Sequence, residues 1–114
     1  QVSKCTVCVA DRDMIVAVAG PAKREFHGQN IHADLIRFME ERGQQIAING
    51  ERNFCRITED GNEVYSEAIS TIVAEGDAIG AVILLTKDPE REFTELEEKM
   101  AVCGANFLGK QMEQ

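Results

Sequence analysis

The C-terminal segment, residues 88–114, most constrains what this chain can fold into. Its apolar residues recur at alternating spacings of three and four, which is typical of one stripe along an α-helix. This first stripe comprises Phe93, Leu96, Met100, Cys103 and Phe107. A second stripe, about 100° further round the helix, comprises Ala101, Ala105, Leu108 and Met112. One stripe can cover the chain's own sheet, so we expect the other to contact a second copy of the chain.

The second half of this helix is rich in small residues, which permit another helix to approach closely. We therefore predict a homodimer or a higher homo-oligomer that forms through the C-terminal helix. The predicted interface residues are Ala101, Gly104, Ala105, Leu108 and Met112. The alternative is a helix that its own domain buries completely. Glutamates near the helix start complement the helix dipole and form a solvated face, rather than a catalytic cluster.

Length and charge exclude several classes of protein. The chain has 114 residues and a formal net charge of −8, which suits one domain and disfavours direct contact with nucleic-acid phosphates. No apolar run approaches the roughly 18 residues that a membrane span requires, so we expect no membrane contact. The chain begins at Gln1, close to strand-like sequence. We therefore expect residues 1–114 to be a single domain from the C-terminal part of a longer protein.

Cys5 and Cys8 form a C-x-x-C motif, which could be half of a redox or zinc site. Their β-branched, apolar surroundings predict a strand, in which residues three apart point to opposite faces. No second pair follows at ligand spacing. We therefore expect buried structural thiols, no metal and no cofactor. Free cysteines without a disulfide framework are typical of the cytoplasm, where we expect the protein to reside.

The first half of the chain predicts a hairpin followed by helices. Residues 7–10 and 14–19 are apolar and separated by a polar turn, which is a hairpin pattern. A short helical turn over residues 21–26 comes next. Asn30 is then expected to cap a helix that ends at Gly43.

The second half predicts paired strands and the long helix. Short strands are expected at residues 45–48 and 54–57, with a turn at 59–62. Residues 64–74 and 78–86 form a hairpin around Glu75-Gly76-Asp77, and the second run is apolar on both faces, as in a central strand. The long helix starts either at Asp88-Pro89 or at the capping box of Thr94 and Glu97. The whole pattern predicts an α+β fold with a central antiparallel sheet flanked by helices.

The run EAISTIVAEGDAIGAVILLTKD (67–88) resembles the paired central strands of GAF domains. Together with VCVADRDMIVAVAG (7–20) and ANFLGKQMEQ (105–114), it resembles the C-terminal GAF domains of transition-state-regulator-like transcription factors of spore-forming bacteria. This resemblance implies a non-catalytic regulatory domain in the control of sporulation. It also implies that DNA is bound only by an upstream domain that these residues do not include.

In GAF domains, small molecules commonly bind between the sheet and the helix-plus-loop segment that crosses it. By this resemblance, residues 31–57 would form the site for an unknown small-molecule effector. The expected ligand contacts are Phe38, Ile48, Phe54, Cys55, Tyr65 and Ser66, of which Phe54, Cys55 and Ser66 are preferred over plain core packing. Arg37, Arg52 and Arg56 could recognise an anion, although arginine is usually a surface residue.

Two alternatives to a sensing domain remain open. Free methionine sulfoxide reductases are similar to some GAF domains and use cysteine chemistry, and here only Cys55 has a comparable position. The other alternative is a structural oligomerisation module whose pocket is filled by side chains.

His27 and His32 are five residues apart and do not share a helical face, so we expect exposed or capping roles for them. The chain carries no nucleophile motif or phosphate-binding glycine motif, and we predict no catalytic residues.

Overall fold

The computed structural model describes residues 5–60 and 63–113. The element order agrees with the predicted order, except that residues 54–57 form no strand. The turn expected at 59–62 includes Gly61 and Asn62, which lie outside the described residues. The elements are β1 (Thr6–Ala10), β2 (Ile15–Ala19), α1 (Lys23–Phe26), α2 (Ala33–Glu40), β3 (Gln44–Ile48), β4 (Ser66–Ala74), β5 (Asp77–Thr86) and α3 (Glu95–Gln111).

The described strands form one antiparallel sheet in the order β2-β1-β5-β4-β3. β4 and β5 are joined by a two-residue loop, Glu75-Gly76, in which both residues have positive φ (53° and 86°). This is the geometry of a type I′ turn, whose twist matches that of the flanking strands. The predicted α+β class with a central antiparallel sheet is confirmed.

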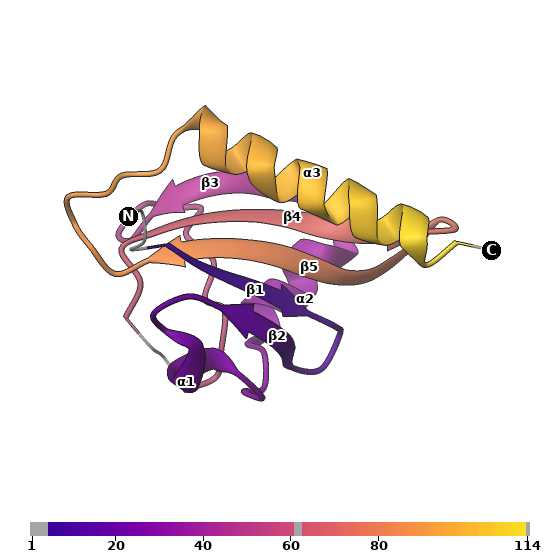
Figure 1. Cartoon of the computed structure of the whole chain (residues 1–114), viewed down its shortest axis with the longest axis horizontal. Helices are drawn as coiled ribbons and strands as arrows, with labels where there is room; N and C mark the ends of the chain where they lie inside the picture. The colour runs from indigo at the N-terminus through magenta and orange to yellow at the C-terminus, as the bar shows by residue number, and fades with distance from the viewer. Residues whose placement is uncertain (1–4, 61–62, 114) are drawn as a thin grey trace.

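Helices cover both faces of the sheet. Figure 1 shows α3 running along one face, while α1 and α2 lie on the other side. Ala68, Val82 and Leu84 pack under α3, whereas Ile69 and Ile83 face α2. Cys8 belongs to the α2 side of the core and Cys5 packs against the α3 side, so the motif is split between faces as predicted. We therefore assign the C-x-x-C motif to core packing.

α2 begins and ends differently from the prediction. Asn30 lies in an extended segment that bridges to Met14. The cap is instead His32, whose Nδ1 accepts a hydrogen bond from the Asp34 backbone N–H at 2.9 Å. At the other end, the left-handed residue is Arg42 (φ 53°), not Gly43. A Cβ at Gly43 would lie 2.7 Å from the Phe38 ring, so a larger residue there would have to displace that ring.

α3 starts at the capping box, which resolves the ambiguity in the sequence. Thr94 accepts from the Leu96 N–H, and Glu97 Oε1 accepts from the Thr94 N–H at 2.8 Å. Such a box satisfies backbone donors that the first helical turn leaves unpaired.

The side of α3 that faces the sheet is the small-residue side. Ala101 and Ala105 are 0% and 1% exposed against the chain's own strands. The expectation that these two alanines contact a second copy is therefore wrong, because their own protomer already covers them. Gly104 and Leu108 are half-buried, Gly104 beside Val82 of β5, and only Met112 of the predicted interface is largely exposed.

Two glycines of α3 give a matched test of how close the helix lies to the sheet. A Cβ at Gly109 would overlap the carbonyl oxygen of Val73, whereas a Cβ at Gly104 would meet Val82 Cγ1 at an ordinary 3.6 Å. We expect Gly109→Ala to lower the free energy of unfolding by about 1–3 kcal/mol through overpacking. Gly104→Ala should be neutral or raise it by up to about 1 kcal/mol, because alanine favours helix. Urea unfolding measures both, and equal effects would contradict this packing.

Candidate functional site

A cavity of about 530 Å³ lies on the α2 side of the sheet, beneath the long segment that joins β3 to β4. Hydrogen bonds close this loop at its base: Asn49 N donates to Tyr65 O at 2.8 Å, and Asn49 Nδ2 donates to Val64 O at 2.9 Å. Its middle is tied to the start of α2, because His32 N donates to Ile57 O at 2.9 Å. The loop is therefore held at both its base and its middle, which gives the cavity a defined wall.

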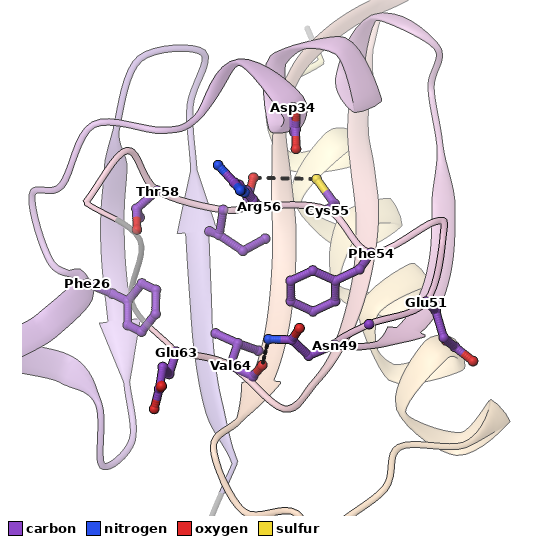
Figure 2. Close-up of a pocket in the computed structure, with 12 residues that line it drawn as sticks. Phe26, Asp34, Asn49, Glu51, Phe54, Cys55, Arg56, Thr58, Glu63 and Val64 are labelled. Carbon is purple, nitrogen blue, oxygen red and sulfur yellow. Dashed lines mark hydrogen bonds between the residues drawn. The ribbon is translucent and has the colours of Figure 1, made fainter.

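Aromatic and charged side chains share the cavity wall. Figure 2 shows the rings of Phe26 and Phe54 on two sides of the space and Asp34 at the start of α2. Apolar surface with a few polar groups is typical of small-molecule sites. The lining residues are Phe26, Asp34, Asn49, Gly50, Glu51, Phe54, Cys55, Arg56, Ile57, Thr58, Glu63 and Val64.

Of the six residues that the sequence predicts as ligand contacts, two lie in the wall of this cavity and four do not. Phe54 and Cys55 line the cavity. Ser66 does not, because β4 turns its hydroxyl to the α3 side, where it accepts from Phe93 N at 3.1 Å. Ile48 pairs with Ser66 and faces the same way. Phe38 packs over Gly43, and Tyr65 lies in a separate depression beside Lys87 and Pro89.

Glu67 of β4 was missed, although it is the most unusual polar residue of this region. Its side chain is 0% exposed. Oε2 accepts a hydrogen bond from the Cys55 backbone N–H at 2.7 Å, which anchors the loop to the sheet. Oε1 has no hydrogen-bond partner, and buried polar atoms without one are rare. The sequence did contain a signal for this residue. Side chains alternate between the two faces of a strand, so Glu67 shares a face with the core residue Ile69.

The surroundings of Glu67 favour its neutral form. Its cross-strand neighbours are Ala47 and Leu85, both buried and apolar. Burial raises the pKa of Glu67 to about 8, the Cys55 N–H opposes this shift, and the negative charge of Asp34 adds to it. The carboxyl group is therefore largely protonated at neutral pH.

The thiol of Cys55 is in a poor environment for nucleophilic chemistry. Burial raises the pKa of Cys55 to about 12, and the charges of Glu67 and Asp34 contribute in the same direction. Because the thiolate is the reactive form, a thiol with so high a pKa is inert at neutral pH.

His32 caps α2 and His27 is exposed, so the roles expected for both histidines are confirmed.

No group of three His, Cys, Asp or Glu side chains within residues 5–60 and 63–113 could hold a metal ion. Among the helices of these residues, none combines the length and the hydrophobicity that a membrane-spanning helix needs.

Comparison with known sequences places the chain near one group of regulators. Residues 1–113 match the family model described as "Stage V sporulation protein T C-terminal, transcription factor". The chain is also 35% identical over 109 residues to stage V sporulation protein T of Bacillus subtilis (strain 168). This match covers 96% of the chain and 60% of the Bacillus protein, so the chain spans less than two-thirds of the length of that relative.

Comparison with solved structures supports the fold. The chain is similar to a type II free methionine-R-sulfoxide reductase from Thermoplasma acidophilum, with a TM-score of 0.64 and 11% sequence identity. The match covers 92% of this chain and 76% of the other. At this identity the likeness concerns the fold alone, which is GAF-like as predicted.

Proposed function

Because the chain belongs to the family of stage V sporulation protein T C-terminal domains, we propose that it is the non-catalytic sensing and dimerisation domain of a sporulation regulator. A small molecule binds in the cavity beneath residues 49–58, 63 and 64, and the domain dimerises through α3. DNA is contacted by another part of the intact regulator, which acts in the cytoplasm.

The cavity is the observation that carries the sensing role. Its volume of about 530 Å³ suits a small ligand, and it lies under a loop fixed to both α2 and β4. A structural module would instead have filled this space with side chains. Binding changes the state of the regulator only if the ligand binds one of two conformations more tightly than the other. We expect the loop that forms the cavity wall to be the element that adopts these two conformations.

The thiol-enzyme alternative receives less support. The burial and the high pKa of Cys55 disfavour a thiolate nucleophile at the one position that a GAF-type reductase mechanism would use here. The likeness to the Thermoplasma reductase extends to the fold and carries no residue role.

Dimerisation is supported by the outer side of α3. Four residues of the first stripe point away from the sheet: Leu96 and Phe107 are each 63% exposed, Met100 is 51% exposed, and Cys103 is exposed. We call these four the outer stripe. Apolar side chains so exposed in a row are typical of an interaction surface. A second copy of α3 is the partner that we propose.

A screen for thermal stabilisation tests the sensing role. A panel of amino acids, amines, carboxylates and nucleotides is added to the 114-residue chain, and the melting temperature is followed. A compound at about 100 times its Kd stabilises by about 2.7 kcal/mol, which raises Tm by roughly 10 °C in a domain of this size. The control is Val64→Phe, which adds bulk to the cavity wall and should abolish the shift. The sensing role is wrong if no compound stabilises the chain, or if the shift survives in Val64→Phe.

A further inference from the structure

The first two residues of β4 hold two different segments on opposite faces of the sheet. Ser66 and Glu67 are both 0% exposed, and neighbouring residues of a strand point to opposite faces. On the cavity side, Glu67 Oε2 accepts a hydrogen bond from the Cys55 N–H at 2.7 Å. On the α3 side, Ser66 Oγ accepts one from the Phe93 N–H at 3.1 Å. A single peptide unit therefore joins the residue that holds the loop between β3 and β4 to the residue that holds the segment before α3.

Water cannot easily replace either hydrogen bond. Cys55 is 5% exposed and Phe93 is 4% exposed, so an N–H that loses its acceptor there is left buried and unpaired, at a cost in free energy. Phe93 directly precedes Thr94, the N-cap of α3, and its ring packs in the core beneath that helix. A shift of Phe93 would therefore move the start of α3, where the outer stripe begins with Leu96.

The loop and the segment before α3 also meet at a second place. Glu51 lines the proposed ligand cavity and also another cavity, of about 320 Å³, which residues of β3 border. Glu92 and Phe93 form part of the wall of this other cavity. In Figure 1, α3 begins at the end of the sheet where β4 starts beside the last residues of β5. The loop is therefore in a position to affect both the ligand cavity and the start of α3.

We propose that the Glu67–Cys55 and Ser66–Phe93 hydrogen bonds form and break together, so that the start of β4 couples the ligand cavity to α3. This inference rests on the proposed function, because it names the route by which a bound ligand acts on the dimer. A ligand that holds the loop in place also holds the start of α3 in place and strengthens the dimer. By linkage, dimerisation strengthens ligand binding by the same factor.

Amide hydrogen exchange, followed by NMR at neutral pH on the 114-residue chain without ligand, tests the coupling. Ser66→Ala removes the acceptor of the Phe93 N–H and leaves the acceptor of the Cys55 N–H in place. Exchange of the Cys55 amide should nevertheless rise about tenfold relative to the Ile83 amide, which lies inside β5 and reports any general loss of stability. Glu67→Leu removes the other acceptor and should speed exchange of the Phe93 amide severalfold. Glu67→Gln keeps an acceptor and should leave Phe93 unchanged.

Thr71→Val is the matched control. It removes another hydroxyl group of β4, which donates to the Gly43 carbonyl at 2.9 Å away from the start of the strand. It should leave the exchange of Cys55 relative to Ile83 unchanged. The coupling is wrong if Ser66→Ala speeds exchange at Phe93 but not at Cys55, or if Thr71→Val has the same effect at Cys55. Glu67→Leu, with Phe93 as the readout, decides the question should Ser66→Ala fail to fold.

Sedimentation equilibrium separates this inference from the proposed function. Ser66→Ala should weaken the dimer severalfold, although Ser66 is buried away from the outer stripe. A dimer as tight as that of the wild type would show that the coupling does not reach α3, and the inference would be wrong. A monomeric wild-type chain would contradict the proposed dimer, and the exchange data would still decide whether the two hydrogen bonds are coupled. Coupled exchange together with no stabilising compound would support the coupling and contradict the sensing role.

Discussion

The free energy of unfolding of this domain should fall by on the order of 3 to 5 kcal/mol as the pH rises from about 5 to about 8. The cause is Glu67, whose pKa is raised from 4.5 to about 8 in the folded chain. Above pH 4.5 the unfolded chain releases this proton, whereas the folded chain keeps it until about pH 8. The free energy of unfolding therefore falls throughout this pH range. Above about pH 8, Glu67 no longer contributes to its pH dependence.

Glu67→Gln isolates this effect, because glutamine keeps the shape and the acceptor for the Cys55 N–H but cannot ionise. The variant should be close to wild type at pH 5 and more stable than wild type at pH 8.5. Urea denaturation at a series of pH values measures both curves. Glu41→Gln removes an exposed carboxylate at the end of α2 and should retain the wild-type slope. A wild-type stability that stays level or rises between pH 5 and pH 8 would contradict the burial of Glu67 as a neutral acid.

Phe107→Asp, or Met100→Asp, should weaken the proposed dimer about 100-fold or more. Either change buries a carboxylate in an apolar contact, which costs several kcal/mol when no partner is present. Within one protomer both side chains face solvent, so the fold itself should persist. Sedimentation equilibrium gives the dimer dissociation constant, and circular dichroism checks that the variants are folded.

Asn106→Asp is the matched control, because it adds the same charge at an exposed neighbouring position beside the outer stripe. It should change the dissociation constant only slightly. Dimerisation through the outer stripe is contradicted if the wild-type chain is monomeric at high concentration, or if Phe107→Asp dimerises as well as wild type.

Local patterns were sufficient to predict most of the fold. The β4–β5 hairpin was identified because two apolar runs flank Glu75-Gly76, a turn that requires positive φ. The start of α3 at Thr94 was among the predicted alternatives because a capping box depends only on residues three apart. Such features are set by neighbours in sequence, and a single chain reveals them without an alignment.

Features that depend on distant parts of the chain were predicted less well. Both stripes of α3 were recognised, but which one faces the sheet depends on how closely the helix can lie against Val73, and this closeness is set by Gly109. The cap of α2 moved from Asn30 to His32 because Asn30 pairs with Met14, a long-range contact. In the sequence, Glu67 looks like an ordinary strand residue, because its hydrogen-bond partner, the Cys55 N–H, lies twelve positions away.

The central claim is that the loop between β3 and β4 forms the wall of a ligand site. Hydrogen–deuterium exchange tests this claim most directly. The chain is compared with and without the compound that gives the largest thermal shift. We predict slower exchange in residues 49–58, including the Cys55 amide that Glu67 holds, and no such protection in Val64→Phe. A bound compound that leaves this segment unchanged and protects another part of the described chain would contradict the account.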